Sequence, residues 1–221
     1  MSTASETDRH VEPDLTAFLM AHAGFRTEFG LLAEVVERPR DEAHRALIED
    51  QITFVVSHLH HHHHEEDTFL WPLIVSRAPQ TAALLDVLTE QHEEIDPYVT
   101  AATDRTRPVV ERATAMRRLH DALGRHLDDE ERIAVPLIRT HITAAEWNSH
   151  GEQVIRSFGR KGIPMLFGWV CAASDSAAVR RSADQHPLPV RLLFRFVWWP
   201  KYHRRHTALY GPGLRRSPDR G

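Results

Sequence analysis

The sequence is poor in cysteine and rich in histidine, with Cys171 as its one cysteine beside 17 histidines. A single cysteine excludes a disulfide within the chain and a thiolate zinc cluster, so a bound metal would need nitrogen and oxygen ligands. No apolar run reaches the roughly 18 residues of a membrane-spanning helix. The first eight residues lack the basic segment and apolar run of a secretory signal, so we expect a cytoplasmic protein.

Common catalytic motifs are missing as well. The chain contains no Gly-x-Ser-x-Gly motif and no glycine-rich phosphate loop. The stretch 92–96, HEEID, lacks the second histidine of the zinc peptidase motif His-Glu-x-x-His. These absences argue against nucleophilic hydrolysis, zinc-dependent proteolysis and nucleotide hydrolysis.

One pattern occurs twice. His-x3-Glu-x5-Pro-Leu-Ile spans residues 62–74 and, 64 positions later, residues 126–138. On a helix, residues four apart lie on one face about 6 Å from each other, so each histidine projects beside its glutamate. Apolar residues lie in register with both pairs, namely Val55, Leu59, Phe69 and Leu73 for the first and Leu119, Leu123, Ile133 and Leu137 for the second. Because a carboxylate that faces a core needs a partner, the repeat predicts two halves of a metal site, formed by His62, Glu66, His126 and Glu130.

Two further histidines interrupt apolar stripes elsewhere. His22 lies in the apolar stripe formed by Leu15, Leu19, Phe25 and Phe29. His92 lies in the stripe formed by Leu85, Leu88, Ile95 and Val99. A lone histidine on an apolar face is more often a satisfied core residue than a ligand. Four such positions on four successive helices, two of them with glutamate partners, favour metal binding.

With these residues in this order, the chain resembles the hemerythrin-like, or HHE cation-binding, family. The resemblance covers about residues 12–141, and the double His-x3-Glu pattern is its most specific part. It implies an up-down four-helix bundle that holds two non-haem iron ions. The implied ligands are His22, His62, Glu66, His92, His126 and Glu130, with the two glutamates bridging the irons.

The chain departs from oxygen-carrying hemerythrins at one position. Those proteins have a second histidine one turn after the first on the third helix, where this chain has Asp96. Either Asp96 ligates one iron or that iron has an open position. His58, one turn before His62, is a reserve candidate, which could replace the missing ligand or hold a carboxylate behind the ligands.

Five consecutive histidines, residues 60–64, lie inside a helical pattern with apolar residues on both sides. Successive helical residues point 100° apart, so only His62 of this run follows the apolar stripe. We therefore expect the other four, His60, His61, His63 and His64, to be solvated or to lie behind the ligands.

Apolar spacing and turn signals predict an all-α fold. The four expected bundle helices cover residues 13–37, residues 42–77, the stretch from about 80 to a turn at 104–108, and residues 109–141. Short connections between long helices indicate an up-down-up-down bundle. Proline interrupts the pattern at positions 72, 97 and 136, and we expect each proline to bend or end its helix.

The expected domains are a disordered segment 1–11, the bundle 12–142, and a C-terminal helical extension with a basic tail, 143–221. Thr143 and Glu146 form a capping box that begins a fifth helix. Apolar segments follow at 163–173 and 188–199, and residues from 202 onward read as an extended tail. Five residues of the second segment are expected to cover the bundle rather than to face a membrane or a partner, namely Leu192, Leu193, Phe196, Val197 and Trp199.

Charge is divided unevenly along the chain. Residues 150–221 carry 13 Lys and Arg against 4 Asp and Glu, a formal +9, whereas residues 1–149 carry a formal −13. This asymmetry favours docking of the extension on the bundle over binding to an acidic partner, a second copy or anionic lipid. Without a recognisable motif, we expect no nucleic-acid partner.

Three functions fit these features. An iron pair with an open position suits binding, sensing or detoxification of O2, peroxide or nitric oxide, whether or not the reaction is catalytic. A di-iron oxygenase acting on a small organic substrate is the second, but ferritin-like oxygenases use Glu-x-x-His, which this chain lacks. The third is an interaction module in which iron controls the docking of residues 150–221.

Overall fold

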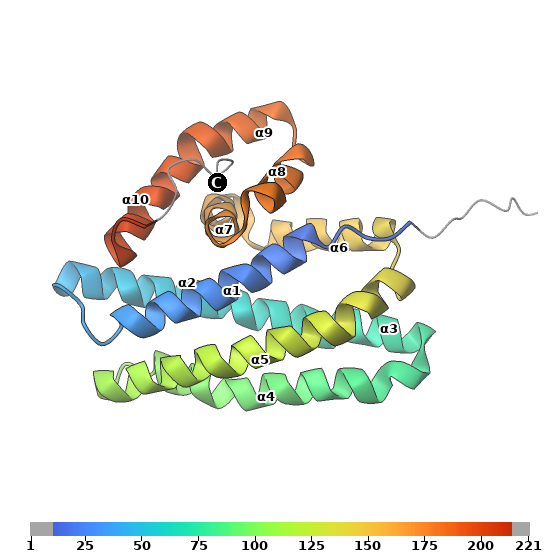
Figure 1. Ribbon diagram of the computed structural model, residues 1–221, viewed down its shortest axis with the longest axis horizontal. Coiled ribbons are helices and arrows are strands. Elements are labelled where there is room, and N and C mark those ends of the chain that lie inside the picture. The colour runs from blue at the N-terminus through green and yellow to red at the C-terminus, as the bar shows by residue number, and fades with distance from the viewer. Residues whose placement is uncertain (1–10, 214–221) are drawn as a thin grey trace, which may run out of the picture.

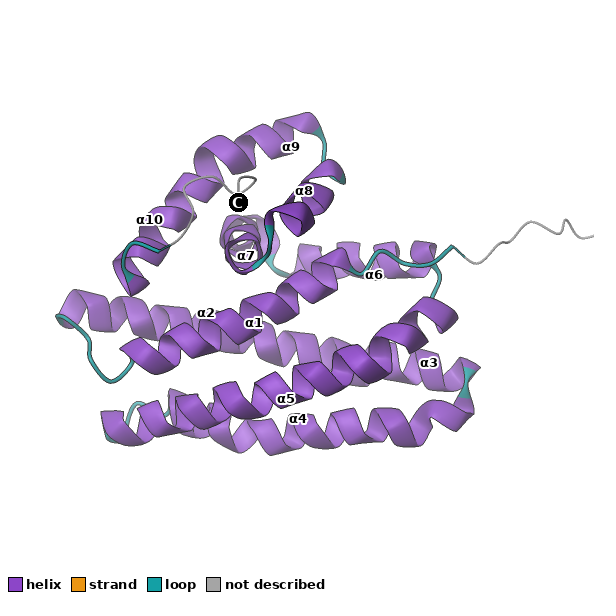
Figure 2. Cartoon of the chain, viewed as in Figure 1, coloured by secondary structure: helices purple, strands orange, loops and turns teal. Residues whose placement is uncertain are grey.

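Four long helical segments form the centre of the computed structural model (Figure 1), which describes residues 11–213 apart from the side chains of residues 160 and 161. Within that range the chain is helical and contains no strand (Figure 2). The bundle comprises α1 (Thr16–Val35), α2 (Glu42–Glu65) continued by a π-helical turn (Glu66–Leu70) and α3 (Trp71–Arg77), α4 (Ala82–Thr103) after a short 3-10 turn (Pro79–Thr81), and α5 (Val109–His141). Contacts join α1 to α2, α2 to α4, α4 to α5 and α5 to α1. The predicted all-α bundle is therefore confirmed.

Local signals in the sequence explain several helix ends. Asp41 caps α2, because its side chain accepts a hydrogen bond from the backbone N–H of His44 at 2.7 Å. Each proline was expected to bend or end its helix, and the second of these alternatives is wrong. Pro97 and Pro136 lie inside α4 and α5, and Pro72 lies in the first turn of α3, so none of them ends its helix. The lost N–H bond is offset because core residues on both sides of each proline hold the helix in place.

The residues that face the core after Glu66 and Glu130 lie one position later in the sequence than predicted. Phe69 is 38% exposed, whereas Leu70 is buried, and in the second copy Ala134 is buried while Ile133 is half-buried. The core-facing row thus continues in steps of four residues, the spacing along which helix ridges pack. In the first copy this row runs through the π-helical turn that begins at Glu66.

The extension packs on the bundle as further helices. These are α6 (Ala144–Ser157), α7 (Gly159–Ala173), α8 (Ser176–Asp184), α9 (Leu188–Leu193), a π-helical turn (Phe194–Trp198) and α10 (Trp199–Tyr210). In Figure 1 helices α7 to α10 lie on the side of α1 and α2, away from α4 and α5. Trp169 of α7 packs edge-on against Phe25, with ring centroids 4.9 Å apart. A Cβ at Gly24 would lie 2.8 Å from Trp169, so a residue without a side chain lets α7 approach α1.

Two expectations about the extension are wrong. Residues after 202 do not begin an extended tail, because α10 continues to Tyr210 and buries Tyr202 and Leu209. Most of the residues expected to cover the bundle also point to solvent. Leu192, Leu193, Phe196 and Val197 are 41–67% exposed, and only Trp199 of the five is buried. The packing face consists instead of Phe194, Trp199 and Tyr202, because the π-helical turn rotates the segment. Most of the predicted disordered segment 1–11 and the end of the basic tail, 214–221, lie outside the described residues.

None of the described helices is long and apolar enough to cross a membrane. The thiol of Cys171 is buried in the core between the bundle and the extension.

A buried polar network fastens α10 to the bundle. The Glu28 side chain is 2% exposed and accepts hydrogen bonds from Gln51 Nε2 at 2.7 Å and from the Tyr210 hydroxyl at 2.5 Å. Arg205 donates from Nε to Gln51 Oε1 at 3.1 Å. Burial raises the pKa of Glu28 above its usual 4.5, although the hydrogen bonds from Tyr210 and Gln51 oppose the shift.

This raised pKa predicts how stability depends on pH. Because the folded protein holds the Glu28 proton more tightly than the unfolded chain, the resulting stability is present below pH 4.5 and is lost as the pH rises through the folded pKa. Glu28→Gln keeps the acceptor but cannot ionise. The urea midpoint of the metal-free wild type should therefore fall relative to that of the variant as the pH rises above about 4.5. Parallel pH curves for the two proteins would contradict this role of Glu28.

Candidate metal centre

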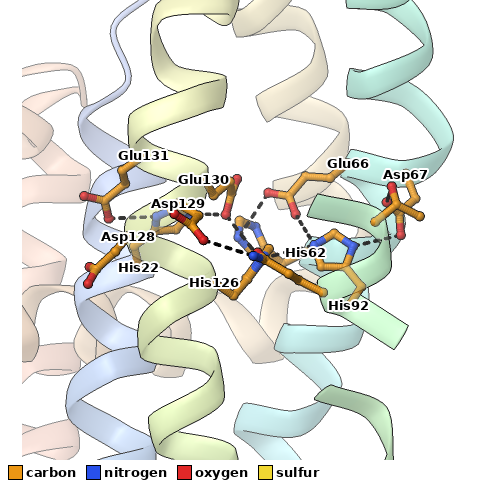
Figure 3. Close-up of polar contacts among 12 residues, drawn as sticks. His22, His62, Glu66, Asp67, His92, His126, Asp128, Asp129, Glu130 and Glu131 are labelled. Carbon is orange, nitrogen blue, oxygen red and sulfur yellow. Dashed lines mark hydrogen bonds and ion pairs between the residues drawn. The ribbon is translucent and has the colours of Figure 1, made fainter. Parts of the chain in front are cut away.

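Two groups of metal-ligating side chains meet inside the bundle (Figure 3). In each group the ligand atoms lie within 4.8 Å of one another. The first group comprises His22 of α1, His62 of α2, Glu66 at the start of the π-helical turn, and Glu130 of α5. The second comprises His63 of α2, His92 of α4 and His126 of α5. Atoms that each lie about 2.0–2.2 Å from one ion are at most about 4.4 Å apart, so a small inward shift of the side chains lets each group hold one ion.

The two carboxylates connect the groups, because each contacts one imidazole of the first group and one of the second. Figure 3 shows both carboxylates pointing toward the imidazoles at the centre. The distances from imidazole Nε2 to carboxylate oxygen are 3.1 Å for His62 to Glu66, 3.6 Å for His92 to Glu66, 3.4 Å for His22 to Glu130 and 3.6 Å for His126 to Glu130. The second group is equally close-set, with the Nε2 atoms of His92 and His126 3.2 Å apart.

Many polar atoms of the two groups are buried without a hydrogen-bond partner. They are both side-chain oxygens of Glu66, both of Glu130, and Nε2 of His22, His62 and His63. Glu66 is 2% exposed and Glu130 is fully buried. Such atoms normally find a partner, because an unpaired buried polar group costs about 1–3 kcal/mol and a charged one more. A cation between the carboxylates and the Nε2 atoms would satisfy them together, so the residues present fit a bound metal.

Three of the imidazoles are oriented by a hydrogen bond from their Nδ1 atom. His22 donates to Glu131 at 3.0 Å, His92 donates to Asp67 at 2.9 Å, and His126 donates to the Gln91 side-chain oxygen at 3.0 Å. A proton on Nδ1 leaves the Nε2 lone pair free, which is the tautomer that binds a metal.

The supporting residues are themselves held. Arg26 donates to Glu131 at 2.7 Å and Thr89 donates to Asp67 at 2.8 Å. The hydrogen bond from His22 and then the Arg26 guanidinium lower the pKa of Glu131 to about 2, although burial opposes them. Burial alone would raise the pKa of Asp67, but hydrogen bonding and charge from His92 leave it below the usual 3.8. Both carboxylates therefore stay ionised at neutral pH and accept the Nδ1 proton.

The electrostatics of the centre favour the metal-binding form of histidine. Burial, followed by the neighbouring imidazoles, lowers the pKa of His62 and His63 well below 6.5 and that of His126 to about 3. These rings are neutral at physiological pH, as metal ligands must be. Burial and the adjacent Glu130 raise the pKa of Glu66 well above 4.5. A cation would reverse this last effect, because it favours the ionised carboxylate.

The structure brings together all six residues that the resemblance implied as ligands, namely His22, His62, Glu66, His92, His126 and Glu130. The two lower-ranked candidates lie outside both groups. Asp96 is exposed and lines a polar groove beside His92, while His58 is buried with its Nδ1 2.6 Å from the Phe54 carbonyl oxygen.

One member of the second group, His63, was not singled out from the sequence. It was expected to be solvated or to lie behind the ligands, and at 6% exposure the first of these alternatives is wrong. Its ring stacks on His92 with centroids 3.9 Å apart. The available signal was Leu59, four residues earlier, which faces the same core. Inside a bundle the buried arc of a helix is wide enough for two consecutive residues, so His62 and His63 both point inward.

Replacement of His63 tests its place in the second group. His63→Ala should reduce the affinity of that group for iron at least about tenfold, because one of its three imidazoles is lost. His64→Ala is the matched control, since its side chain is exposed and belongs to neither group. Iron content after dialysis against a graded chelator measures the effect. Equal iron retention by the two variants would exclude His63 as a ligand.

Comparison with known families agrees with this geometry. The family described as "Hemerythrin HHE cation binding domain" matches residues 14–138, which include α1 to α4, most of α5 and every residue of the two groups. No curated protein and no solved structure matches the chain significantly. With more than half of its length covered by that match, the chain belongs to the hemerythrin HHE cation-binding domain family.

Proposed function

We propose that this chain is a non-haem di-iron protein that binds or reacts with O2, peroxide or nitric oxide. The observation that carries the proposal is the position of Glu66 and Glu130, each in contact with imidazoles of both groups. A carboxylate in that position can bridge two ions. We place His22 and His62 on one iron, and His63, His92 and His126 on the other.

The donor set supports iron. Imidazole and carboxylate without thiolate suit iron better than structural zinc, which commonly takes cysteine and four tetrahedral ligands. With both glutamates shared, the first ion would have four protein donors and the second five. Both numbers are below the six of an octahedral ion, so either ion could accept a small ligand. When bound, an iron pair supplies redox chemistry and positions for such ligands.

The surrounding residues prepare the site for this chemistry. Glu131, Asp67 and Gln91 orient three imidazoles and hold their Nδ1 protons. Phe18 and Phe25 cover the first group, with ring centroids 4.2 Å from His22 and 5.3 Å from His62, respectively. These rings give the first group an apolar approach that suits a small uncharged molecule such as O2 or nitric oxide.

A second candidate function is di-iron oxygenation of a small organic substrate. It is favoured by an apolar cavity of about 280 Å³ whose wall includes His62 and Glu66. The absence of Glu-x-x-His separates this chain from the ferritin-like oxygenases and ranks the candidate second.

Optical spectra of the iron-loaded protein test the first proposal. The wild type should bind two irons per chain and show a near-ultraviolet absorption band that changes on addition of peroxide, O2 or nitric oxide. Glu130→Gln should bind less than half as much iron and lose most of the spectral change, because a neutral amide bridges two cations poorly. Glu152→Gln, an exposed change on α6, serves as the control. A colourless wild type that binds no iron would contradict the proposal.

A further inference from the structure

The cavity beside the metal centre lies between the bundle and the C-terminal extension. Its bundle wall includes Phe18, Phe25, His62 and Glu66. Helices α6, α7 and α8 provide the opposite wall, which includes Trp147, Phe158, Phe167 and Trp169. The family domain ends at residue 138, so the second wall belongs to the part of the chain that the family does not account for.

Among these metal-ligating side chains, His62 is the most exposed. The His62 side chain is 14% exposed, whereas the side chains of His22, Glu66, His92, His126 and Glu130 are at most 6% exposed. His62 also lines the cavity together with Glu66. A molecule in the cavity would therefore lie directly beside the first group.

The size of the cavity sets the size of its occupant. A buried apolar cavity of about 150 Å³ accepts one benzene molecule. This cavity has a volume of about 280 Å³, nearly twice as large. It therefore fits a molecule of about ten to twelve non-hydrogen atoms, such as a compound with two fused rings.

The chemistry of the walls sets the class of occupant. Ring side chains from both walls offer faces and edges on which an aromatic molecule can stack. No Lys or Arg occurs among the described lining residues, Glu65 and Glu66 are acidic, and five histidines are the other ionisable side chains. An anion would therefore meet two carboxylates and no permanently charged cation among these residues, so the cavity favours a neutral molecule.

We propose that this cavity is a binding site for a neutral aromatic molecule of about ten to twelve non-hydrogen atoms, held next to His62 by the C-terminal extension. The inference deepens the second candidate function, since it names the class of molecule presented to the metal centre. The occupancy of the cavity itself depends on the protein walls and not on the metal.

Calorimetric titration of the full chain with 2-naphthol tests this proposal, with 2-naphthalenesulfonate as the charged comparison. We expect saturable one-to-one binding of 2-naphthol to both metal-free and iron-loaded protein, and at least tenfold weaker binding of the sulfonate. Absence of saturable 2-naphthol binding, or equal affinity for the two compounds, would overturn the proposal.

Variants that fill the cavity provide the second part of the test. Gly151 of α6 lines the cavity, and a Cβ added there meets no heavy atom within 4 Å. Gly151→Leu should weaken 2-naphthol binding at least tenfold, and Gly151→Ala less. Gly124→Leu on α5 is the matched control, because its Cβ also meets no atom within 4 Å and it does not line the cavity. Should Gly151→Leu fail to fold, Val154→Phe fills the same cavity. Unchanged affinity in a folded cavity-filling variant would refute the site.

Failure of this proposal and failure of the di-iron proposal give different results. Saturable 2-naphthol binding by a protein that takes up no iron supports the cavity site and overturns the di-iron function. Iron uptake and a peroxide response without 2-naphthol binding overturn the cavity site alone. In iron-loaded protein the proton resonances of bound 2-naphthol should broaden relative to zinc-loaded protein, and equal line widths would contradict its position beside His62.

Discussion

The structure depends on two glutamates placed in a protein core beside imidazoles. Glu66 and Glu130 have all four carboxylate oxygens buried without a hydrogen-bond donor, and each contacts imidazoles from two different helices. Two buried carboxylates this close cannot both be ionised unless a cation balances their charge, and this chain belongs to a cation-binding family. The bundle helices, the residues behind the imidazoles and the aromatic cover are consistent with that single requirement.

Much of this centre follows from sequence periodicity. His62 and Glu66 are four residues apart, as are His126 and Glu130, and the apolar residues around them repeat every three or four positions, so the shared inward face was predictable. The same reasoning extends to His22 and His92, which interrupt apolar stripes on their own helices. Which residues support the imidazoles was less accessible, because the Asp67 and Glu131 contacts depend on how α2, α4, α1 and α5 pack together.

Other features arise only from tertiary packing. His63 was assigned away from the core because one residue per turn was allowed to face inward, yet a helix inside a bundle buries a wider arc. Helix α10 escaped prediction because the stretch after residue 202 contains many polar residues and is held by buried contacts of Tyr202, Leu209 and Tyr210 with distant parts of the chain. The cavity is likewise a product of two segments, a family domain and an extension, that meet across an apolar interface.

Diffraction from crystals of the iron-loaded protein, recorded at the iron absorption edge, would test the central claim most directly. The account predicts two anomalous peaks about 3.5–4 Å apart between Glu66 and Glu130, as in other two-metal sites. One peak should lie beside His22 and His62, and the other beside His63, His92 and His126. A single peak, or peaks outside the two groups, would contradict the account.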